Sequence, residues 1–160
     1  MHFFGLLKVS ELLSQDSSVF QGRPGIQVSD IKAMANKLQI NITGSKTDQE
    51  RIGEVIVMER VVRYPALCPV LSVRQLLNKI PSHSGSLFIH YDGSKLTRYQ
   101  FHAVLTKAAK FLGWNSKGFT SHSFRIGAAT TAIMNGMPKE VLMLMGRWKS
   151  NAVNSYIRPI

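Results

Sequence analysis

A chain of 160 residues with 44% hydrophobic side chains can bury the core of one domain and is too apolar for a disordered protein. Its single cysteine, Cys68, excludes an internal disulfide framework and fits a reducing compartment, and no apolar run approaches the ~20 residues of a membrane helix. The net charge of +11 is uneven, because residues 81–160 carry ten basic and only two acidic residues. This half therefore favours a polyanion such as nucleic acid over a membrane.

The first half of the chain predicts a short helix followed by a small sheet. The stretch "MHFFGLLKVSELL" has no basic leader, so we expect no signal peptide there. It is instead typical of the end of a helix with four buried residues, Phe3, Phe4, Leu7 and Leu12. A Ser/Gly/Pro-rich loop over 14–25 leads into strands at 25–31 and over 36–58, where apolar residues alternate. The polar tip of this antiparallel hairpin holds Lys46.

The second half predicts mainly helices. A helix over 69–79 leads to an extended bridge at 83–95 with an Asp-Gly turn. A helix capped by Thr97 then ends at Gly113, with an apolar stripe formed by Phe101, Leu105, Ala108 and Leu112. Further helices are expected over 121–135 with Ser121 as N-cap, from Pro138 at the first position to Gly146, and from Ser150 as N-cap to Pro159. The order of a small sheet and then a run of helices indicates an α+β fold.

The start of the helix at 121 carries an unusual pair of side chains. His122 and Arg125 are three residues apart, which places them on one face of the helix. A cation in the first turn lies near the positive end of the helix dipole and is poorly placed there. We therefore expect an anion close to Arg125.

Five residues in chain order could together cleave a phosphodiester. Tyr156 could attack the phosphorus, Arg125 could hold the non-bridging oxygens, and His122 could donate a hydrogen bond or a proton. Trp148 precedes the tyrosine in "GRWKS", and Lys46 could protonate the leaving oxygen from the hairpin tip. This chemistry needs no metal ion, and the sequence has no carboxylate cluster to bind one. We expect no cofactor.

The ordered motifs resemble the catalytic domain of tyrosine recombinases, which are phage-integrase-like proteins. "SHSFRIGAATTA" looks like the His-x-x-Arg box, "LMGRWKSNAVNSYIR" looks like the tyrosine box, "GSKTDQ" looks like the lysine hairpin, and "FFGLLKVSELL" looks like the first-arginine motif. "SKTDQ" and "GRWKS…YIR" resemble the eukaryotic mobile-element branch, such as DIRS-like retrotransposons. The resemblance implies a mostly helical catalytic domain over 1–160, without the family's N-terminal core-binding domain and C-terminal exchange helix.

The resemblance also implies roles and partners. DNA would be cleaved through a 3′-phosphotyrosyl intermediate, with six catalytic positions at Tyr156, Arg125, His122, Lys46, Trp148 and Lys8. The partners would be double-stranded DNA and further copies of the chain on that DNA, in a synaptic tetramer, with no membrane and no small-molecule substrate. Three further basic residues are expected to contact the DNA: Arg147, Lys149 and Arg98. A eukaryotic protein would act in the nucleus, and a bacterial one in the cytoplasm.

Lys8 departs from the family pattern, which has arginine at this position. A lysine offers one mobile point charge where arginine offers a planar two-pronged clamp. This substitution keeps open a catalytically weakened DNA-binding module of the same fold. A protein-interaction scaffold is a third possibility, against which the basic second half argues. Each residue alone also has an ordinary reading as a capping, packing or surface group, so the joint order of the motifs carries the prediction.

Overall fold

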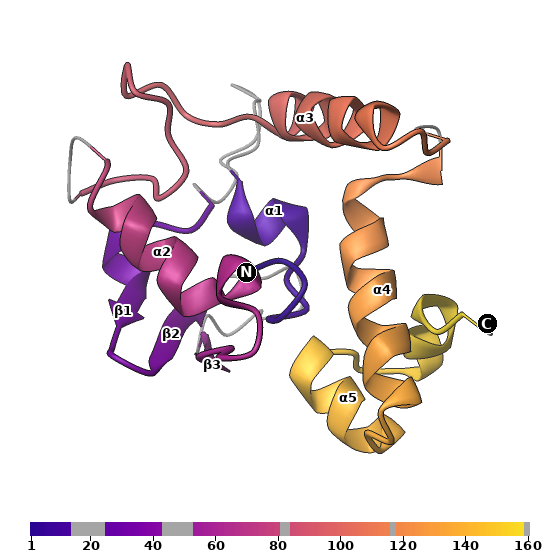
Figure 1. Ribbon diagram of the computed structural model, residues 1–160. Coiled ribbons are helices and arrows are strands. Elements are labelled where there is room, and N and C mark those ends of the chain that lie inside the picture. The colour runs from indigo at the N-terminus through magenta and orange to yellow at the C-terminus, as the bar shows by residue number, and fades with distance from the viewer. Residues whose placement is uncertain (14–24, 43–52, 81–83, 116–117, 159–160) are drawn as a thin grey trace. The chain divides into compact units, whose positions relative to one another are not determined.

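The computed structural model describes residues 1–13, 25–42, 53–80, 84–115 and 118–158. The chain divides into two compact units, one of residues 1–9 and 99–160 and the other of residues 10–98. The elements in chain order are α1 (Val9–Leu12), η1 (Val28–Asp30), β1 (Ile31–Ala33), β2 (Lys37–Ile42), β3 (Glu54–Glu59), η2 (Pro65–Leu67), α2 (Pro69–Leu77), α3 (Arg98–Phe111), α4 (Ser121–Met134), α5 (Lys139–Gly146) and η4 (Asn151–Tyr156), where η marks a 3-10 helix. The α+β fold class predicted from the sequence is confirmed (Figure 1).

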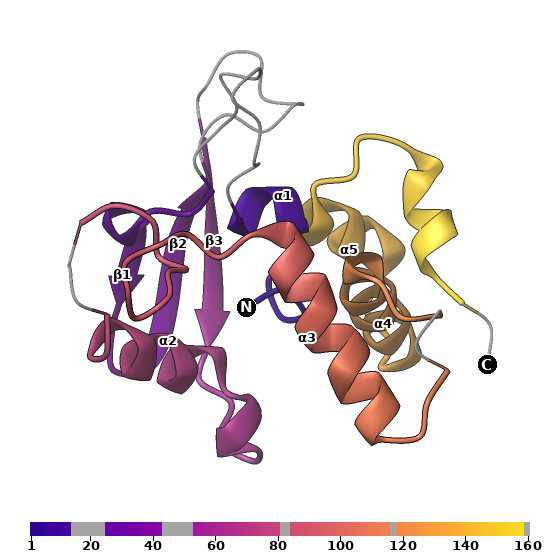
Figure 2. The ribbon, with the colours of Figure 1, turned by 90° about the horizontal axis from the view of Figure 1, so that it is seen from above.

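The unit of residues 10–98 is built on an antiparallel sheet in the order β1-β2-β3. Ile40 in the central strand is paired with Ile31 on one side and Ile56 on the other. Helix α2 contacts all three strands (Figures 1 and 2). Alternate residues of β2 are buried in the core of this unit. Its buried side chains include Ile26, Leu38, Ile40, Ile42, Met58, Val70, Val73 and Leu87.

One sequence prediction in this unit needs correction, and two others lie outside the described residues. The strand expected at 25–31 is mostly the 3-10 turn η1, because the Asp30 carboxylate accepts a hydrogen bond from the Gln27 N–H at 2.9 Å and closes a turn. Only Ile31–Ala33 pairs as a strand. The hairpin tip with Lys46 and the loop at 14–24 lie outside the described residues. The Asp-Gly turn is confirmed, since Ser94 N–H donates to the Asp92 carboxylate at 2.9 Å.

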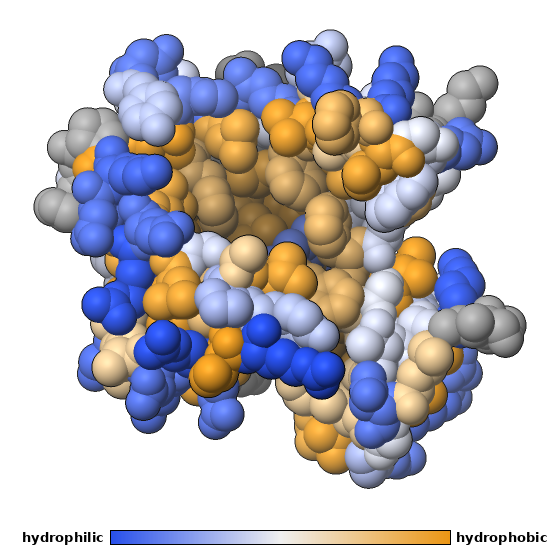
Figure 3. Space-filling model, in the orientation of Figure 1, coloured by the Kyte–Doolittle hydropathy of each residue, from blue (hydrophilic) through white to orange (hydrophobic). Residues whose placement is uncertain are grey.

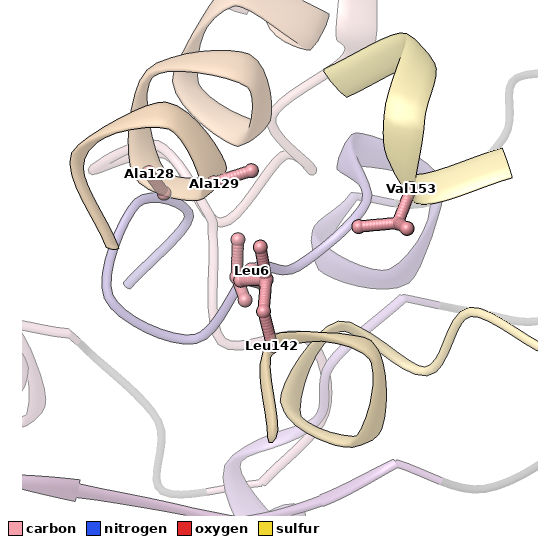
Figure 4. Close-up of a cluster of buried hydrophobic side chains, with 5 residues drawn as sticks. All are labelled: Leu6, Ala128, Ala129, Leu142 and Val153. Atoms are coloured by element: carbon pink, nitrogen blue, oxygen red, sulfur yellow. The ribbon is translucent and has the colours of Figure 1, made fainter. Parts of the chain in front are cut away.

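The unit of residues 1–9 and 99–160 packs α4, α5 and η4 around a small apolar core. Figure 4 shows the side chains at its centre pointing toward one another, and they are Leu6, Ala128, Ala129, Leu142 and Val153. Two alanines on α4 leave room for the N-terminal segment to reach this core. Phe3 of that segment packs at Gly127, where an added Cβ would lie 3.6 Å from the ring, an ordinary contact.

The N-terminal segment is not the expected end of a helix. Residues 2–6 form turns, and only Val9–Leu12 is helical. Leu7 and Leu12 are buried as predicted, but Phe3 is half-buried and Phe4 is 36% exposed. Leu6 adopts a left-handed backbone with φ +47°, which turns the chain and is incompatible with a continuing helix.

The helix boundaries of this unit differ in detail from the sequence prediction. Thr120, not Ser121, is the N-cap of α4, with an extended backbone and a 3.0 Å hydrogen bond from its N–H to the Ser123 hydroxyl. Pro138 is the N-cap of α5 and does not occupy its first helical position. The Ser150 N-cap is confirmed, because its hydroxyl accepts a hydrogen bond from the Ala152 N–H.

The apolar stripe of α3 is also displaced from the predicted one. Ala109 is the buried residue, whereas Ala108 and Leu112 are exposed. Figure 3 shows apolar side chains on the surface over α3, consistent with the exposure of Val104 and Phe111. Among the described helices, none combines the length and the apolar content needed to cross a bilayer.

Candidate active site

Helix α4 brings His122 and Arg125 to one side, where they meet two aromatic residues from the C-terminal segment. The His122 ring centroid lies 5.6 Å from that of Tyr156. The Trp148 and Tyr156 centroids are 5.1 Å apart. The Arg125 guanidinium carbon lies 4.2 Å from the Trp148 ring centroid and 5.4 Å from the Tyr156 centroid. The structure therefore brings together four of the residues that the sequence singles out, from positions up to 34 apart along the chain.

Tyr156 is positioned by its own backbone. It ends η4, which contacts α4, and its carbonyl accepts a hydrogen bond from the Thr130 hydroxyl at 3.3 Å. The same hydroxyl accepts from the Arg158 N–H at 3.1 Å. Thr130 thus fixes the chain on both sides of the tyrosine, while the phenol ring remains half-buried and His122 is exposed.

Arg125 is far more buried than a surface cation. Only 2% of the residue is exposed, and its guanidinium donates to the backbone carbonyls of Leu6 and Gly146. A buried charge is stabilised when such dipoles replace water, and the face of an indole adds a cation–π interaction. The sequence predicted an anion beside this arginine, and two of the acceptors of its hydrogen bonds are backbone carbonyl oxygens.

Gly146 is required by the packing of Trp148. A Cβ added to Gly146 would lie 1.9 Å from the indole carbon Cζ3, far inside van der Waals contact. The absence of a side chain lets the indole lie against the end of α5, where it also covers Arg125. The "GRW" sequence is thus one packing unit.

A hydrogen bond joins Arg147 to the backbone of Leu6 in this cluster. Arg147 ends α5 with a left-handed backbone, φ +58°, and its Nη2 donates to the Leu6 carbonyl at 3.4 Å. The same carbonyl accepts from Arg125. Two guanidinium groups therefore share one backbone oxygen.

His2 lies beside the cluster as a buried neutral base. It is 9% exposed, and its ring stacks on Phe124 with the centroids 5.2 Å apart. Burial lowers the pKa of His2 from 6.5 to about 4, and the positive charges of the amino terminus and Arg125 add to this effect. Nothing in the sequence pattern pointed to His2.

The remaining predicted residues are described by their exposure and their place in the chain. Lys8 is half-buried and follows Leu6 by two positions, Lys149 is exposed, and Arg98 is exposed at the start of α3 in the other unit. Lys46 lies outside the described residues. The described residues contain no group of three or more histidines, cysteines or carboxylates placed to hold a metal ion. Sequence reasoning missed the carbonyls of Leu6 and Gly146, because a backbone acceptor leaves no signature in residue types.

The arrangement places an imidazole and a guanidinium group against one phenol ring. A phenol oxygen is a nucleophile when a base or cation lowers the cost of its ionisation, and guanidinium groups stabilise negative charge on phosphoryl oxygens. The described cluster therefore holds chemical groups suited to nucleophilic substitution at an anionic centre.

Comparison with known protein structures shows the same fold. XerA recombinase matches with a TM-score of 0.65 at 16% identity, over 84% of this chain and 45% of that chain. XerH site-specific recombinase, in a pre-cleavage complex with its difH substrate, matches with a TM-score of 0.62 at 15% identity, over 84% of this chain and 37% of that chain. The Tn1549 transposon integrase, in complex with a circular intermediate DNA, matches with a TM-score of 0.60 at 14% identity, over 99% and 52%.

The chain spans between 37% and 52% of the length of these three structures. No curated protein matches its sequence significantly. A model of the phage integrase family, however, matches residues 24–159, which is most of the chain. The chain belongs to the phage integrase family.

Proposed function

We propose that this chain is the catalytic domain of a site-specific DNA recombinase that cleaves and rejoins strands through Tyr156. The phenolate oxygen attacks the phosphorus, a 3′-phosphotyrosyl bond forms, and the 5′ oxygen leaves and takes a proton to become a hydroxyl. Attack by the 5′-hydroxyl of a second strand reverses the step and releases the tyrosine. Arg125 holds the non-bridging oxygens, and His122 and Trp148 contact the same phosphate. Lys8 supplies a second cation, and Lys46 protonates the leaving oxygen.

The contact of His122, Arg125 and Trp148 with Tyr156 is the observation that carries this proposal. A tyrosine used only for packing has no need of an imidazole and a guanidinium around its ring. Here both come from one helix face whose register the His-x-x-Arg spacing fixes. Family membership supports the same assignment.

The proposed partner is double-stranded DNA. The unit that holds the cluster, residues 1–9 and 99–160, carries nine basic side chains and one acidic side chain. Phosphate contacts by Lys149, Arg147 and Arg98 would add sequence-independent affinity. DNA complexes of XerH and the Tn1549 integrase support this choice of partner. We also propose that copies of the chain self-associate on the DNA as a synaptic tetramer. The proposed source is a eukaryotic mobile element, and the chain would then act in the nucleus.

A covalent-trapping experiment tests the proposal. The chain is incubated with a library of nicked duplexes whose short downstream fragment diffuses away after cleavage, so rejoining is lost. A label at the 5′ end of the cleaved strand should then migrate with the protein in a denaturing gel. Tyr156→Phe should give no labelled protein, because only the nucleophilic oxygen is removed. The matched control is Tyr99→Phe on α3, where the tyrosine is 82% exposed and the adduct should form as in the parent chain. An adduct that survives Tyr156→Phe would reject the assignment.

A second candidate function is a DNA-binding module of the same fold that no longer cleaves. Two features favour it: the resemblance to the first-arginine motif expects an arginine where this chain has Lys8, and Arg125 is buried against two carbonyls. The same trapping experiment separates the two functions when Lys8→Arg is added. An adduct in the parent supports the recombinase, and an adduct only in Lys8→Arg supports a weakened site whose other groups remain intact. Binding without adduct in either would support the module.

A further inference from the structure

The C-terminal part of α3 carries an exposed apolar patch that the proposed active site does not use. Phe111 is 91% exposed, and Val104, Leu112 and Trp114 are each more than half exposed. Figure 3 shows apolar side chains gathered on the surface over this helix. A ring that faces water contributes little to the core, and a group of such side chains on a surface marks a place where a ligand or partner binds.

The aromatic residues that follow α3 are held in place by the end of the helix. Gly113 has a left-handed backbone, φ +70°, and its N–H donates to the Lys110 carbonyl at 3.0 Å. The Trp114 N–H donates to the Ala109 carbonyl at 2.9 Å, which completes a Schellman motif. Trp114 then stacks on Phe119, with the ring centroids 5.1 Å apart and the planes 22° from parallel. A ligand that stacks on the indole therefore meets a ring that is already ordered.

The charges beside these rings have one sign. Lys107 and Lys110 are exposed in the last two turns of α3, and Lys107 is four residues from Phe111, on the same side of the helix. The sequence from 93 to 139 contains no acidic residue that could compensate them. Exposed cations next to exposed aromatic rings fit a ligand that carries both negative charge and flat rings.

We propose that the C-terminal end of α3 binds single-stranded DNA. Bases stack on Phe111 and Trp114, and the phosphates contact Lys107 and Lys110. The ligand is single-stranded because the bases of a duplex stack on one another, whereas unpaired bases offer a free ring face. An acidic amphipathic helix would also match the lysines, but it has no flat rings to place on the aromatic side chains. Cleavage by the proposed recombinase releases a strand of this kind, and binding at α3 does not itself require cleavage.

Two labelled strands of equal length and equal charge test this proposal by fluorescence anisotropy at one salt concentration. One is an oligothymidine of about 12 nucleotides, and the other is the same sugar–phosphate strand without bases. The parent should bind the oligothymidine more tightly. Phe111→Ala should weaken that binding by about 5- to 100-fold, the usual loss for one stacked base, and leave the affinity for the abasic strand unchanged. Lys110→Ala should weaken the binding of both strands, because both carry phosphates.

The matched control is Tyr99→Ala, which removes a ring that is 82% exposed from the other end of α3 and should leave both affinities unchanged. Circular dichroism checks that each variant folds as the parent does. Equal affinity of the parent for the two strands would overturn the proposal, and so would an equal loss in Phe111→Ala and Tyr99→Ala.

A synthetic helical peptide with leucines along one face and glutamates on the other tests the alternative partner. Binding of this peptide that depends on Phe111, in a parent that shows no preference for bases, would assign the surface to a protein and overturn the proposal. The recombinase function and the strand-binding site can fail separately, because the anisotropy measurement involves no cleavage at Tyr156.

Discussion

Gly146 shows how strongly one residue can control the candidate site. The Trp148 indole occupies the space that any side chain at position 146 would fill. The same indole lies beneath the Arg125 guanidinium and packs at a tilt against the Tyr156 ring, so a displaced tryptophan alters the surroundings of two proposed catalytic groups together. A glycine at the end of a helix is usually explained by its backbone freedom, but here the reason is the close approach of a ring.

Gly146→Ala is therefore expected to lower the free energy of unfolding by about 1–3 kcal/mol, the usual cost of overpacking. Gly127→Ala is the matched control, because its added Cβ would make an ordinary 3.6 Å contact with Phe3 inside α4. That change should raise the free energy of unfolding by about 0.5–1 kcal/mol through helix propensity. Urea denaturation of the two variants and the parent measures both effects. Equal stabilities for the two alanine variants would contradict the packing argument.

His2 makes the stability of the folded chain depend on pH. In the unfolded chain the imidazole binds a proton as the pH falls below about 6.5, whereas the pKa of about 4 keeps it neutral in the folded chain. Protons therefore favour the unfolded state, and the contribution of His2 to stability is lost as the pH falls from about 6.5 toward 4. The slope is at most about 1.4 kcal/mol per pH unit.

The corresponding experiment compares the parent with His2→Phe by urea denaturation at pH 7 and pH 5. A phenyl ring can keep the stacking on Phe124 and does not titrate. The parent should lose more stability between the two pH values than the variant does. The carboxylates and other histidines are common to both proteins, so the difference isolates His2. An identical loss in both proteins would show that His2 is not buried as a neutral base.

At the scale of the elements, the sequence predicted those strands and helix ends that follow from the periodicity of apolar residues and from the positions of proline and glycine. Alternation located β2 and β3, and Pro69 and Gly113 bounded two helices correctly. The N-cap residue of α4 was harder to predict, because Thr120 and Ser121 are both good N-cap residues. The hydrogen bond between Thr120 and Ser123 decides between them. The N-terminal turns were misread as a helix, because an apolar run does not encode the left-handed Leu6.

The candidate site, too, was predictable from the sequence only in part. The positions of His122 and Arg125 on one face follow from helical spacing, and their meeting with Tyr156 could be expected only from the order of the family motifs. The burial of Arg125 and the role of the Leu6 carbonyl depend on long-range packing between residues 119 positions apart. Such contacts involve backbone oxygens, which any residue provides. They become visible only once the chain is folded.

At the scale of the whole chain, the distribution of charge bears most directly on function. Residues 1–9 and 99–160 carry nine basic residues and one acidic residue, whereas residues 10–98 carry eleven and eight. A nearly uncompensated basic unit that also holds the candidate site fits a phosphate-bearing partner. Contacts with that partner release counterions, so their number can be measured through salt.

The affinity of the chain for duplex DNA is accordingly expected to fall steeply with salt. A plot of the logarithm of the association constant against the logarithm of salt concentration should be linear, with a slope near −0.9 for each phosphate contacted. Lys149→Ala and Arg98→Ala, which each remove an exposed cation, should reduce the magnitude of that slope by about 1. Tyr99→Phe changes no charge and should keep the parent's slope. Filter binding on one fixed duplex between 50 and 200 mM salt measures the slope for all four proteins. A basic surface that binds phosphates must displace cations from them. A flat line for the parent would therefore argue against DNA as the partner.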